Sequence, residues 1–352
     1  MACFWKNERN AVEVCLREVG NYVYIGYEDP DPDYSLIEVA RDLSGYVKTE
    51  IPGAVSGANG LLYSKRRRIY QPRYNTTPNP ATVTIWRDDG AGVFSQISGV
   101  PTGLAPWSRG MNYTGGKLRG VNWDAGFNCS LYESDDGETW TVLPGSVTFN
   151  YNPTEPASYT MIGSRIVANR LTSSTGTPRF YYSDNGGATW VGAGGNGSGG
   201  DPQHPFLHSG ANVIASLAGD VFVTSDGASW ALNTSIYMWF RSGAPKLAAN
   251  GSGRVVIYGQ HYVTGDYAFA YSSNNGTSFT VRTVVAIGMP DFSVCHALFW
   301  DPVGDQFVAF IQRGDLSSSD PYQIYTSPTG QNWAAGIVIP RVYDSNVVQV
   351  ID

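Results

Sequence analysis

A short motif built around a glycine recurs along this chain, and it constrains the fold more than any other feature. The six glycines are Gly90, Gly137, Gly186, Gly227, Gly276 and Gly330, and successive copies lie 47, 49, 41, 49 and 54 residues apart. A period of about 40 to 50 residues is typical of repeat proteins in which each repeat forms one four-stranded sheet. The spacing therefore predicts a ring of similar β-sheets.

Each copy combines the same residue types around its glycine. An Asp or Asn precedes most of the glycines, at Asp89, Asp136, Asn185, Asp226 and Asn275, and its side chain can accept hydrogen bonds from nearby backbone N–H groups. The glycine supplies the positive φ that such a turn needs. A hydroxyl residue lies three positions before five of the glycines, at Ser134, Ser183, Thr224, Ser273 and Ser327. An aromatic residue follows, suited to the seam between sheets, at Phe94, Trp140, Trp190, Trp230, Phe279 and Trp333.

The segment Ser134–Trp140 (SDDGETW) resembles the Asp-box, or BNR, repeat of the sialidase-like β-propellers. The copies at 183–190 and 224–230 are similar, whereas those at Arg87, Ser273 and Ser327 depart further from the pattern. The resemblance covers residues 85–335 through its hairpins. It implies an all-β, seven-bladed β-propeller of four-stranded antiparallel blades with Asp-box hairpins, and it gives the box residues a structural role.

The first sixty residues complete the count of blades. Four strand-like runs precede residue 53, and Gly45 lies 45 residues before Gly90 with Asp42 and Ser44 beside it. Residues 35–40 also fit a short helix. We predict one domain, 1–352, with a C-terminal strand at 345–352 that closes the ring and so removes its open edges. The predicted blades span 10–53, 58–99, 105–145, 155–195, 205–234, 244–284 and 294–338.

Composition argues against several classes of function. The net charge is −7 and the pI about 5.1, which disfavours nucleic acid as a partner. We see no signal peptide and no apolar run of about 20 residues, so we expect no membrane insertion. Four scattered cysteines, Cys3, Cys15, Cys129 and Cys295, predict reduced thiols rather than a metal site, with Cys3 and Cys15 the one pair near in sequence. We expect no metal and no cofactor.

In the sialidase-like propellers, the ligand site lies on the face opposite the Asp boxes. The connections expected on that face are rich in aromatic and polar residues, which suit sugar rings. The predicted ligand-binding residues are Trp107, Arg109, Tyr159, His208, Trp239 and Arg241. The alternative is that Trp107 and Trp239 cap the core at the ends of strands. A basic run, 65–68, fits either a carboxylate-binding group or a solvated strand.

The catalytic residues of a sialidase are not recognisable in this chain. The family carries an Arg-Ile-Pro motif, and the chain has Arg68-Ile69-Tyr70. We therefore predict a non-catalytic propeller, with a glycoside hydrolase using Glu155, Asp201 or Asp291 as the alternative. Few lysines and abundant Gly, Ser, Thr, Asn and Tyr resemble bacteriophage tail and adhesion proteins. The expected location is a virion (phage tail) or extracellular, and the expected partners are other virion proteins or a cell-surface glycan. A soluble bacterial assembly factor is a further alternative.

Overall fold

The computed structural model describes a large part of the 352-residue chain. The described residues are 21–27, 34–40, 42–50, 62–63, 69–70, 73–75, 82–90, 93–97, 112–114, 117–123, 128–136, 138–144, 147–148, 159–169, 180–194, 206–217, 220–236, 242–261, 264–290, 294–302, 304–312 and 321–339. Among them, the regular elements are β-strands and one short 3-10 helix, η1 (Val285–Ile287).

Four sheets contain four antiparallel strands each, paired in chain order. The first two are β14 (Tyr159–Ile162), β15 (Arg165–Asn169), β16 (Phe180–Ser183) and β17 (Val191–Gly192), followed by β18 (Leu207–Ser209), β19 (Asn212–Leu217), β20 (Asp220–Thr224) and β21 (Ala231–Leu232). The last two are β22 (Ser242–Ala249), β23 (Val255–Gln260), β24 (Tyr267–Ser272) and β25 (Thr280–Thr283), followed by β26 (Val294–Asp301), β27 (Gln306–Gln312), β28 (Tyr322–Ser327) and β29 (Ala334–Ile339).

The remaining sheets come from the first half of the chain. A three-stranded sheet contains β1 (Asn21–Tyr27), β2 (Tyr34–Ala40) and β3 (Tyr46–Glu50), and β4 (Leu62–Tyr63) pairs with β5 (Ile69–Tyr70). A second three-stranded sheet contains β6 (Arg73–Asn75), β7 (Thr82–Gly90) and β8 (Val93–Ile97). The five-stranded sheet consists of β9 (Asn112–Thr114), β10 (Lys117–Trp123), β11 (Asn128–Ser134), β12 (Thr141–Val142) and β13 (Val147–Thr148).

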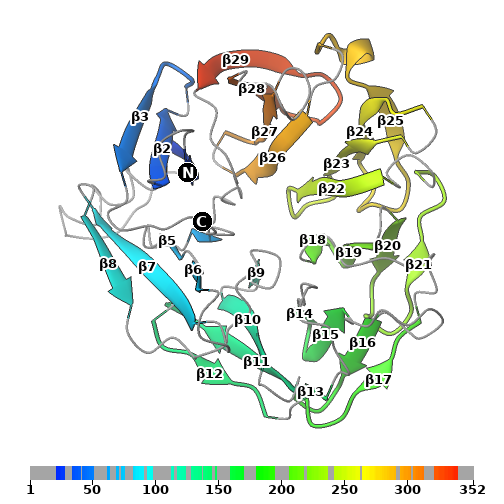
Figure 1. Ribbon diagram of the computed structural model, residues 1–352. Helices are drawn as coiled ribbons and strands as arrows, with labels where there is room; N and C mark the ends of the chain where they lie inside the picture. Colours follow the sequence, from blue (N-terminus) through cyan, green and yellow to red (C-terminus); the bar gives the residue numbers. More distant parts are fainter. Residues whose placement is uncertain are drawn as a thin grey trace, which may run out of the picture.

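These sheets stand around a common axis in the order of the sequence (Figure 1). In each four-stranded sheet the first strand lies nearest the axis and the fourth lies on the outside. The architecture is a β-propeller, as predicted. The helix that residues 35–40 also fitted is absent, because they belong to strand β2. The count of seven blades stays a prediction, and the closing strand at 345–352 lies outside the described residues.

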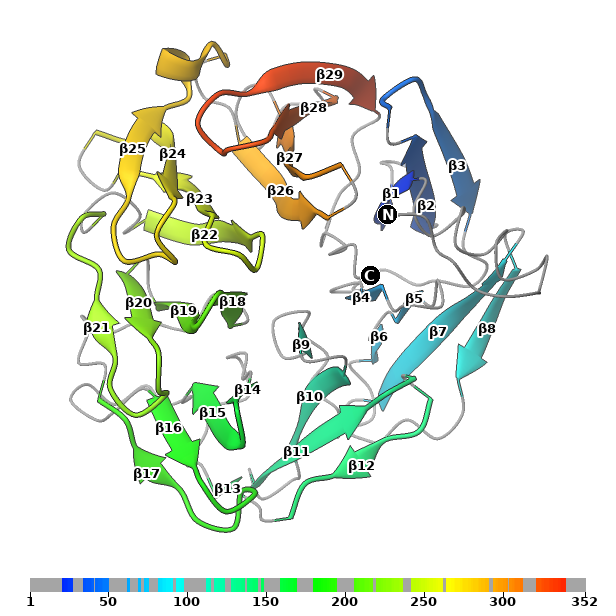
Figure 2. The same cartoon turned by 180° about the vertical axis from the view of Figure 1, so that it is seen from behind.

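The hydrophobic core is divided among the seams between neighbouring sheets. Val167 and Phe180 of the β14–β17 sheet pack against Val213 and Phe222 of the β18–β21 sheet, and all four side chains are buried. Val39 of β2 packs in the same way against the β26–β29 sheet. Strand β3 lies beside β29 in both views (Figures 1 and 2). The first and last sheets therefore meet, and apolar contact between them joins the two ends of the series of sheets.

The repeated turns connect the third strand of a sheet to its fourth. In the turn after β20, the Thr224 hydroxyl accepts a hydrogen bond from Gly227 N at 2.8 Å. Asp226 Oδ1 accepts two more, from the backbone N–H groups of Ala228 and Ser229, both at 2.9 Å. The φ of Gly227 is 72°. Hydroxyl, carboxylate and glycine thus perform the functions that the sequence predicted for them.

The aromatic residues Trp230 and Trp333, which follow two of the turns, pack across the seams between sheets, as predicted. Trp230 stacks on Phe180 of the preceding sheet with ring centroids 3.8 Å apart, and Trp333 lies 4.5 Å from Phe269. The indole N–H groups of Trp230 and Trp333 each donate to the carbonyl of the turn glycine, at 3.3 Å to Gly227 O for Trp230. The corresponding distance for Trp333 is 3.2 Å. Each tryptophan therefore ties its own turn to the neighbouring sheet.

The turn after β16 is one residue longer than the spacing around Gly186 predicted. The Ser183 hydroxyl accepts from Gly187 N at 2.8 Å, so Gly187 and not Gly186 is the equivalent of Gly227. Gly186 is the inserted residue, with φ of 69°. Asn185 keeps its predicted role, because its Oδ1 accepts from the Thr189 backbone N–H at 2.9 Å.

The turn after β24 has the same extra residue. The Ser272 hydroxyl accepts from Gly276 N at 3.0 Å, and Asn274 Oδ1 accepts from the Ser278 backbone N–H at 3.1 Å. The predicted pair Ser273 and Asn275 is therefore displaced by one position. Asn275 is the inserted residue, in the left-handed region with φ of 59°.

The first predicted copy differs more. Asp89 and Gly90 belong to strand β7, and Gly90 pairs with Val93 of β8. In the copy at Asp136, Oδ1 accepts from the N–H groups of Glu138 and Thr139 at 2.8 Å, and Gly137 lies outside the described residues.

Close packing between sheets explains why the turn residue is glycine. A Cβ atom on Gly276 would lie 2.6 Å from Cδ1 of Ile214 in the preceding sheet. A Cβ on Gly227 would overlap Val167, and one on Gly330 would overlap Val256. Each of these residues comes from the second strand of the preceding sheet. The glycines therefore admit both a positive φ and a neighbouring aliphatic side chain.

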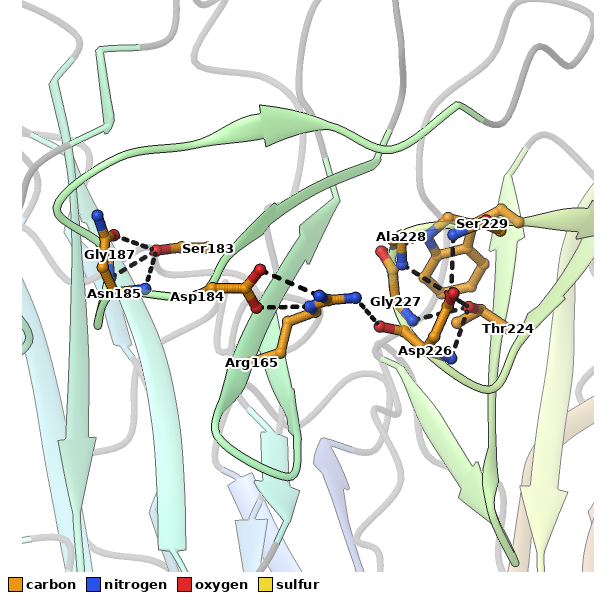
Figure 3. Close-up of polar contacts among 11 residues, drawn as sticks. Arg165, Ser183, Asp184, Asn185, Gly187, Thr224, Asp226, Gly227, Ala228 and Ser229 are labelled. Carbon is orange, nitrogen blue, oxygen red and sulfur yellow. Dashed lines mark hydrogen bonds and ion pairs between the residues drawn. The ribbon is translucent and has the colours of Figure 1, made fainter.

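A second repeated device links each turn to the sheet before it. Arg165 Nε and Nη2 donate to the Asp184 carboxylate at 2.7 and 3.0 Å, and Arg165 Nη1 donates to Asp226 O at 2.6 Å (Figure 3). The hydrogen bond with Asp184 raises the pKa of Arg165 and lowers that of Asp184. Asn212 donates to Asn275 O at 3.0 Å in the same way. The contacts of Arg165 with Asp226 and of Asn212 with Asn275 join neighbouring sheets, while Asp184 holds Arg165 in place within its own sheet.

The turns therefore lie on one face of the ring. In an antiparallel sheet, the connection between strands one and two lies at the same end as that between strands three and four. The first connection of the β18–β21 sheet contacts that of the β22–β25 sheet, since Gly210 N donates to Gly251 O at 2.9 Å. Arg254 reaches Pro328 O of the β26–β29 sheet at 2.9 Å. We call this end of the sheets the turn face and the opposite end the loop face.

Candidate functional site

The structure describes two of the six predicted ligand-binding residues. Trp107, Arg109, Trp239 and Arg241 lie outside the described residues. The basic run 65–68 also lies outside them. The candidate carboxylates of the alternative hydrolase, Glu155, Asp201 and Asp291, also lie outside them. The predictions for these residues stay predictions.

Tyr159 is a core residue and does not lie on a rim. Its side chain is fully buried in a cluster with Leu131 and Ile166. The Tyr159 hydroxyl donates to Tyr132 O at 2.6 Å. A buried hydroxyl needs such a partner, so the contact is structural and the prediction of a ligand-binding role for Tyr159 is wrong.

His208 lies at the turn face, not at the opposite rim where the sequence placed it. It pairs with Val213 in the register of β18 and β19, and Val213 pairs with Thr224, the hydroxyl residue of the repeated turn. The loop-face end of β19 lies four residues further on, which is roughly 13 Å along a strand. His208 was predicted to lie in a connecting loop, whereas Leu207–Ser209 forms the short strand β18.

His208 belongs to a polar group near the axis, which we call the axial cluster: Arg119, Glu133, Thr160 and His208. Thr160 Oγ1 and His208 Nε2 lie 2.7 Å apart and join the innermost strands of two sheets. Burial lowers the pKa of His208, and the positive charge of Arg119 lowers it further. Arg119 is nearly fully buried, with Nη2 3.9 Å from Glu133 Oε2.

Lys117 completes the electrostatics of the axial cluster. Its Nζ donates to Glu133 Oε1 at 2.7 Å and lies 3.8 Å from Asp135 Oδ1. The hydrogen bond with Glu133 raises the pKa of Lys117, and the two carboxylates add to the effect. Together with Lys117 and Asp135, the axial cluster thus places two cations and two carboxylates at its outer side and the imidazole of His208 at its inner side. Such a group can hold neighbouring strands together, and its imidazole can accept a proton.

A second polar group lies at the loop face of the β26–β29 sheet. The register of β26 against β27 shifts between Cys295 and Ala297, so His296 is the extra residue of a β-bulge. His296 Nε2 lies 2.7 Å from Oε1 of Gln312, which is fully buried. Its ring lies 4.7 Å from that of Tyr322. Bulges often redirect a side chain beside a binding site, and this one holds an imidazole between an amide and an aromatic ring.

Strand β22 carries a similar irregularity in the neighbouring sheet. Its register against β23 shifts between Ser242 and Lys246, again toward the loop face. Strand β22 begins directly after Arg241, and Trp239 lies two residues before Arg241. Two predicted ligand-binding residues therefore adjoin, along the chain, the same end of the ring that presents His296. This loop-face end of the β22–β25 and β26–β29 sheets is the candidate functional site.

The described part of the chain shows neither a cluster of metal ligands nor a membrane-spanning helix. No three His, Cys, Asp or Glu side chains in that part come together as metal ligands would. No helix in the same part is long and apolar enough to span a bilayer.

Comparison with known proteins shows the fold. No protein-family model matches the chain, and no curated protein matches it. Among solved structures, the GH74 enzyme of Niastella koreensis superposes with a TM-score of 0.54 at 16% identity, over 90% of this chain and 53% of the enzyme. The GH74 xyloglucanase of Xanthomonas campestris gives 0.50 at 15% identity, over 79% and 45%. This chain thus spans about half the length of these two enzymes.

A third structure matches over nearly its whole length. It is a Bacteroides fragilis protein described as a candidate 6-phosphogluconolactonase, with a TM-score of 0.51 at 13% identity, over 94% of this chain and 96% of that protein. Identities this low establish a shared architecture and leave activity open. The β-propeller fold is therefore supported by the sheets and by these similar structures.

Proposed function

We propose that this protein is a non-catalytic binding propeller that takes a glycan on its loop face. The observation that supports this most is the contrast between the two faces. On the turn face, polar groups such as Arg165, Asp226 and Asn275 bind neighbouring turns and so belong to the scaffold. The loop face carries His296 on a bulge and adjoins, along the chain, Trp239 and Arg241.

A glycan is the ligand that these residues suit best. Flat aromatic side chains pack on the apolar faces of sugar rings, while imidazole, amide and guanidinium groups bind hydroxyls. Two of the similar structures, at low identity, are GH74 glycoside hydrolases, and this agrees with a carbohydrate ligand. We further propose that the repeated turns are Asp boxes of the sialidase-like propellers, since hydroxyl, carboxylate and glycine form the same local network in successive sheets.

The biological setting that we propose is a structural or adhesion component of a phage tail or virion. The loop face would then bind a cell-surface glycan, and other parts of the ring would contact neighbouring virion proteins. This proposal rests on composition: few charged residues, 15%, and 41 glycines in an acidic chain. Co-purification with an assembled particle would support it, whereas isolation only as a free protein would favour the soluble assembly factor.

Binding of the full chain to a glycan array tests the proposal. Wild type is expected to retain at least one glycan, and Trp239→Ala is expected to weaken it at least tenfold, because a central aromatic contact contributes more than about 1.4 kcal/mol. Asp305→Asn is the matched control. Asp305 is exposed in the turn after β26 at a φ of 49°, which Asn tolerates, and lies on the turn face. Equal loss in both variants, or no binding by wild type, would contradict the proposal.

A sugar-release assay separates binding from hydrolysis. The proposal expects a bound glycan to be recovered intact. Release of reducing sugar that disappears in Glu155→Gln, Asp201→Asn or Asp291→Asn would instead establish the glycoside hydrolase.

A further inference from the structure

The repeated sheets provide an internal control for what the scaffold requires at each position. In the second strand of each sheet, one residue pairs with the hydroxyl residue of the turn, and we compare the residue that follows it. In four sheets this residue is Val167, Ile214, Val256 or Val308, and all four side chains are fully buried. In β10 the equivalent residue is Arg119, also nearly fully buried. Burying a guanidinium where the scaffold accepts methyl groups is costly, so Arg119 invites a functional explanation.

Two more polar residues occupy mostly apolar positions of the repeat. Thr160 pairs with Val167. The equivalent residue is Asn112 in the preceding sheet, and Leu207, Ala248 and Phe299 in the next three sheets. His208 pairs with Val213, where the equivalent residues are Tyr113, Met161, Ala249 and Trp300. Arg119, Thr160 and His208 come from three consecutive sheets and meet in the axial cluster.

The contact between Thr160 and His208 joins separate sheets. Strands β14 and β18 lie side by side in both views (Figures 1 and 2), and the 2.7 Å hydrogen bond links them near the turn face. The charged groups that face His208 come from the β9–β12 sheet. They are Arg119, which acts on the imidazole, and behind it Glu133 and Lys117, which pair with each other. Strand β19, packed on the other side, contributes the apolar Val213.

We propose that His208, Thr160 and Arg119 form an acid-sensitive lock between strands β14 and β18. Neutral His208 holds the two innermost strands together. When a proton from solvent adds to the imidazole, a second cation arises beside Arg119 in a poorly solvated place. The protonated ring must also donate at Nε2, so the Thr160 hydroxyl can only accept. The cost of burying the new charge and its repulsion from Arg119 loosen the seam at the turn face, independently of the proposed glycan site.

The sign of the pH effect follows from the environment of His208. Burial and Arg119 both lower its pKa in the folded protein, below the ordinary value of about 6.5. As the pH falls, the unfolded chain binds the proton first, so stability is complete above about pH 6.5 and declines until the pH reaches the folded pKa. Each unit of pKa difference shifts the folding equilibrium about tenfold.

His261 offers a matched control. It is half-buried in the connection after β23 on the loop face, where its Nδ1 accepts from the Thr264 backbone N–H at 3.1 Å. It has no part in the seam between β14 and β18.

The test combines three measurements on the full chain. NMR titration should give His208 a pKa below about 6.5, and Arg119→Met should raise it. Hydrogen exchange, corrected for intrinsic rates, should show β14 and β18 opening more often at about pH 5 than at about pH 7.5. His208→Gln should reduce the fall in Tm over this range, while His261→Gln should retain it.

Opposite results would overturn the lock. They are a His208 pKa at or above about 6.5, exchange in β14 and β18 that does not depend on pH, or an unchanged pH dependence in His208→Gln. If His208→Gln fails to fold, the titration and exchange of wild type still decide the matter.

Discussion

Replacing Gly276 by alanine should show how much the close packing between the β18–β21 and β22–β25 sheets contributes to stability. Two penalties apply at this position. The residue has φ of 76°, which costs an L-residue roughly 1–2 kcal/mol. The added Cβ would also lie 2.6 Å from Cδ1 and 3.2 Å from Cγ1 of Ile214, and overpacking of this kind costs about 1–3 kcal/mol. We expect Gly276→Ala to lower the free energy of unfolding by about 2–5 kcal/mol.

Gly251 provides the control that isolates the backbone term. Its φ is 73°, nearly that of Gly276, and no heavy atom lies within 4 Å of an added Cβ. Gly251→Ala should lower the free energy of unfolding by about 1–2 kcal/mol. The lower conformational entropy of the unfolded chain with alanine offsets part of this loss. Urea unfolding followed by tryptophan fluorescence and circular dichroism measures both variants, with coincident transitions as the check on two-state behaviour.

A double variant decides whether Ile214 is the cause. Ile214→Val removes Cδ1, the nearest atom to the added methyl, and alone should cost about 0.5–1.5 kcal/mol. Combined with Gly276→Ala, it should relieve the overlap. The double variant should therefore lose about 1–3 kcal/mol less stability than the sum of the losses in the two single variants. The reasoning fails if Gly276→Ala costs no more than Gly251→Ala, or if the effects add to within about 0.5 kcal/mol.

Three further predictions concern single contacts. Asp226→Ala should cost about 1–2 kcal/mol in urea unfolding because two backbone N–H groups lose their acceptor, whereas Asp226→Asn should cost less, as Asn185 and Asn274 serve elsewhere. The Ser229 N–H and the other donors lower the pKa of Asp226, so its contribution is present above about pH 4 and lost as the pH falls through the folded value. Acid unfolding should show a shallower loss in Asp226→Asn. Arg165→Met should lower Tm, and the difference from wild type should shrink in high salt as the exposed pair with Asp184 is screened. Burial raises the pKa of the Cys295 thiol to about 12, so native protein treated with iodoacetamide at about pH 8 should leave Cys295 unlabelled by mass spectrometry, and labelling would contradict its burial.

The propeller could be predicted from the sequence because its signal is local and repeated. The turn needs a hydroxyl, an acid or amide and a glycine within four or five residues, and their hydrogen bonds run over the same short distance. Such contacts are encoded by neighbours in the chain. One copy of the pattern is a weak signal, but its repetition at a regular spacing predicts the whole fold.

Register within two turns could not be read from the glycine alone. Gly186 and Gly187 offer two candidates in one copy, and Asn274 and Asn275 in another. In the first of these copies, the aromatic residue holds the missing information, because Trp190 follows Gly187 by three residues, the same interval that separates Gly227 from Trp230. In the second copy, Phe279 follows Gly276 by the same interval, so the aromatic residue does not choose between Asn274 and Asn275. There the extra residue precedes the glycine, and the hydrogen bonds of Ser272 and Asn274 identify it.

The axial cluster was harder to predict because its contacts join residues far apart in the chain. Thr160 and His208 are 48 residues apart, and neither has a sequence neighbour that indicates the other. The position of His208 between the turn face and the loop face depends on where the three-residue strand β18 begins. Hydrophobic periodicity cannot resolve the start of so short a strand. The donors that begin the second strands did leave a signal, in Lys117-Leu118, Arg165-Ile166, Asn212-Val213 and Arg254-Val255.

Comparison among repeats recovers part of what sequence alone cannot supply. A lone buried arginine is explained as readily by packing as by function, since structural ion pairs also occur in cores. Here four equivalent positions show that the scaffold accepts Val or Ile, so packing does not require Arg119. The same comparison explains Gly276 and Gly330 without any function, because each faces such an aliphatic residue. Departures from the repeat, rather than its conserved chemistry, are therefore where experiments on activity should begin.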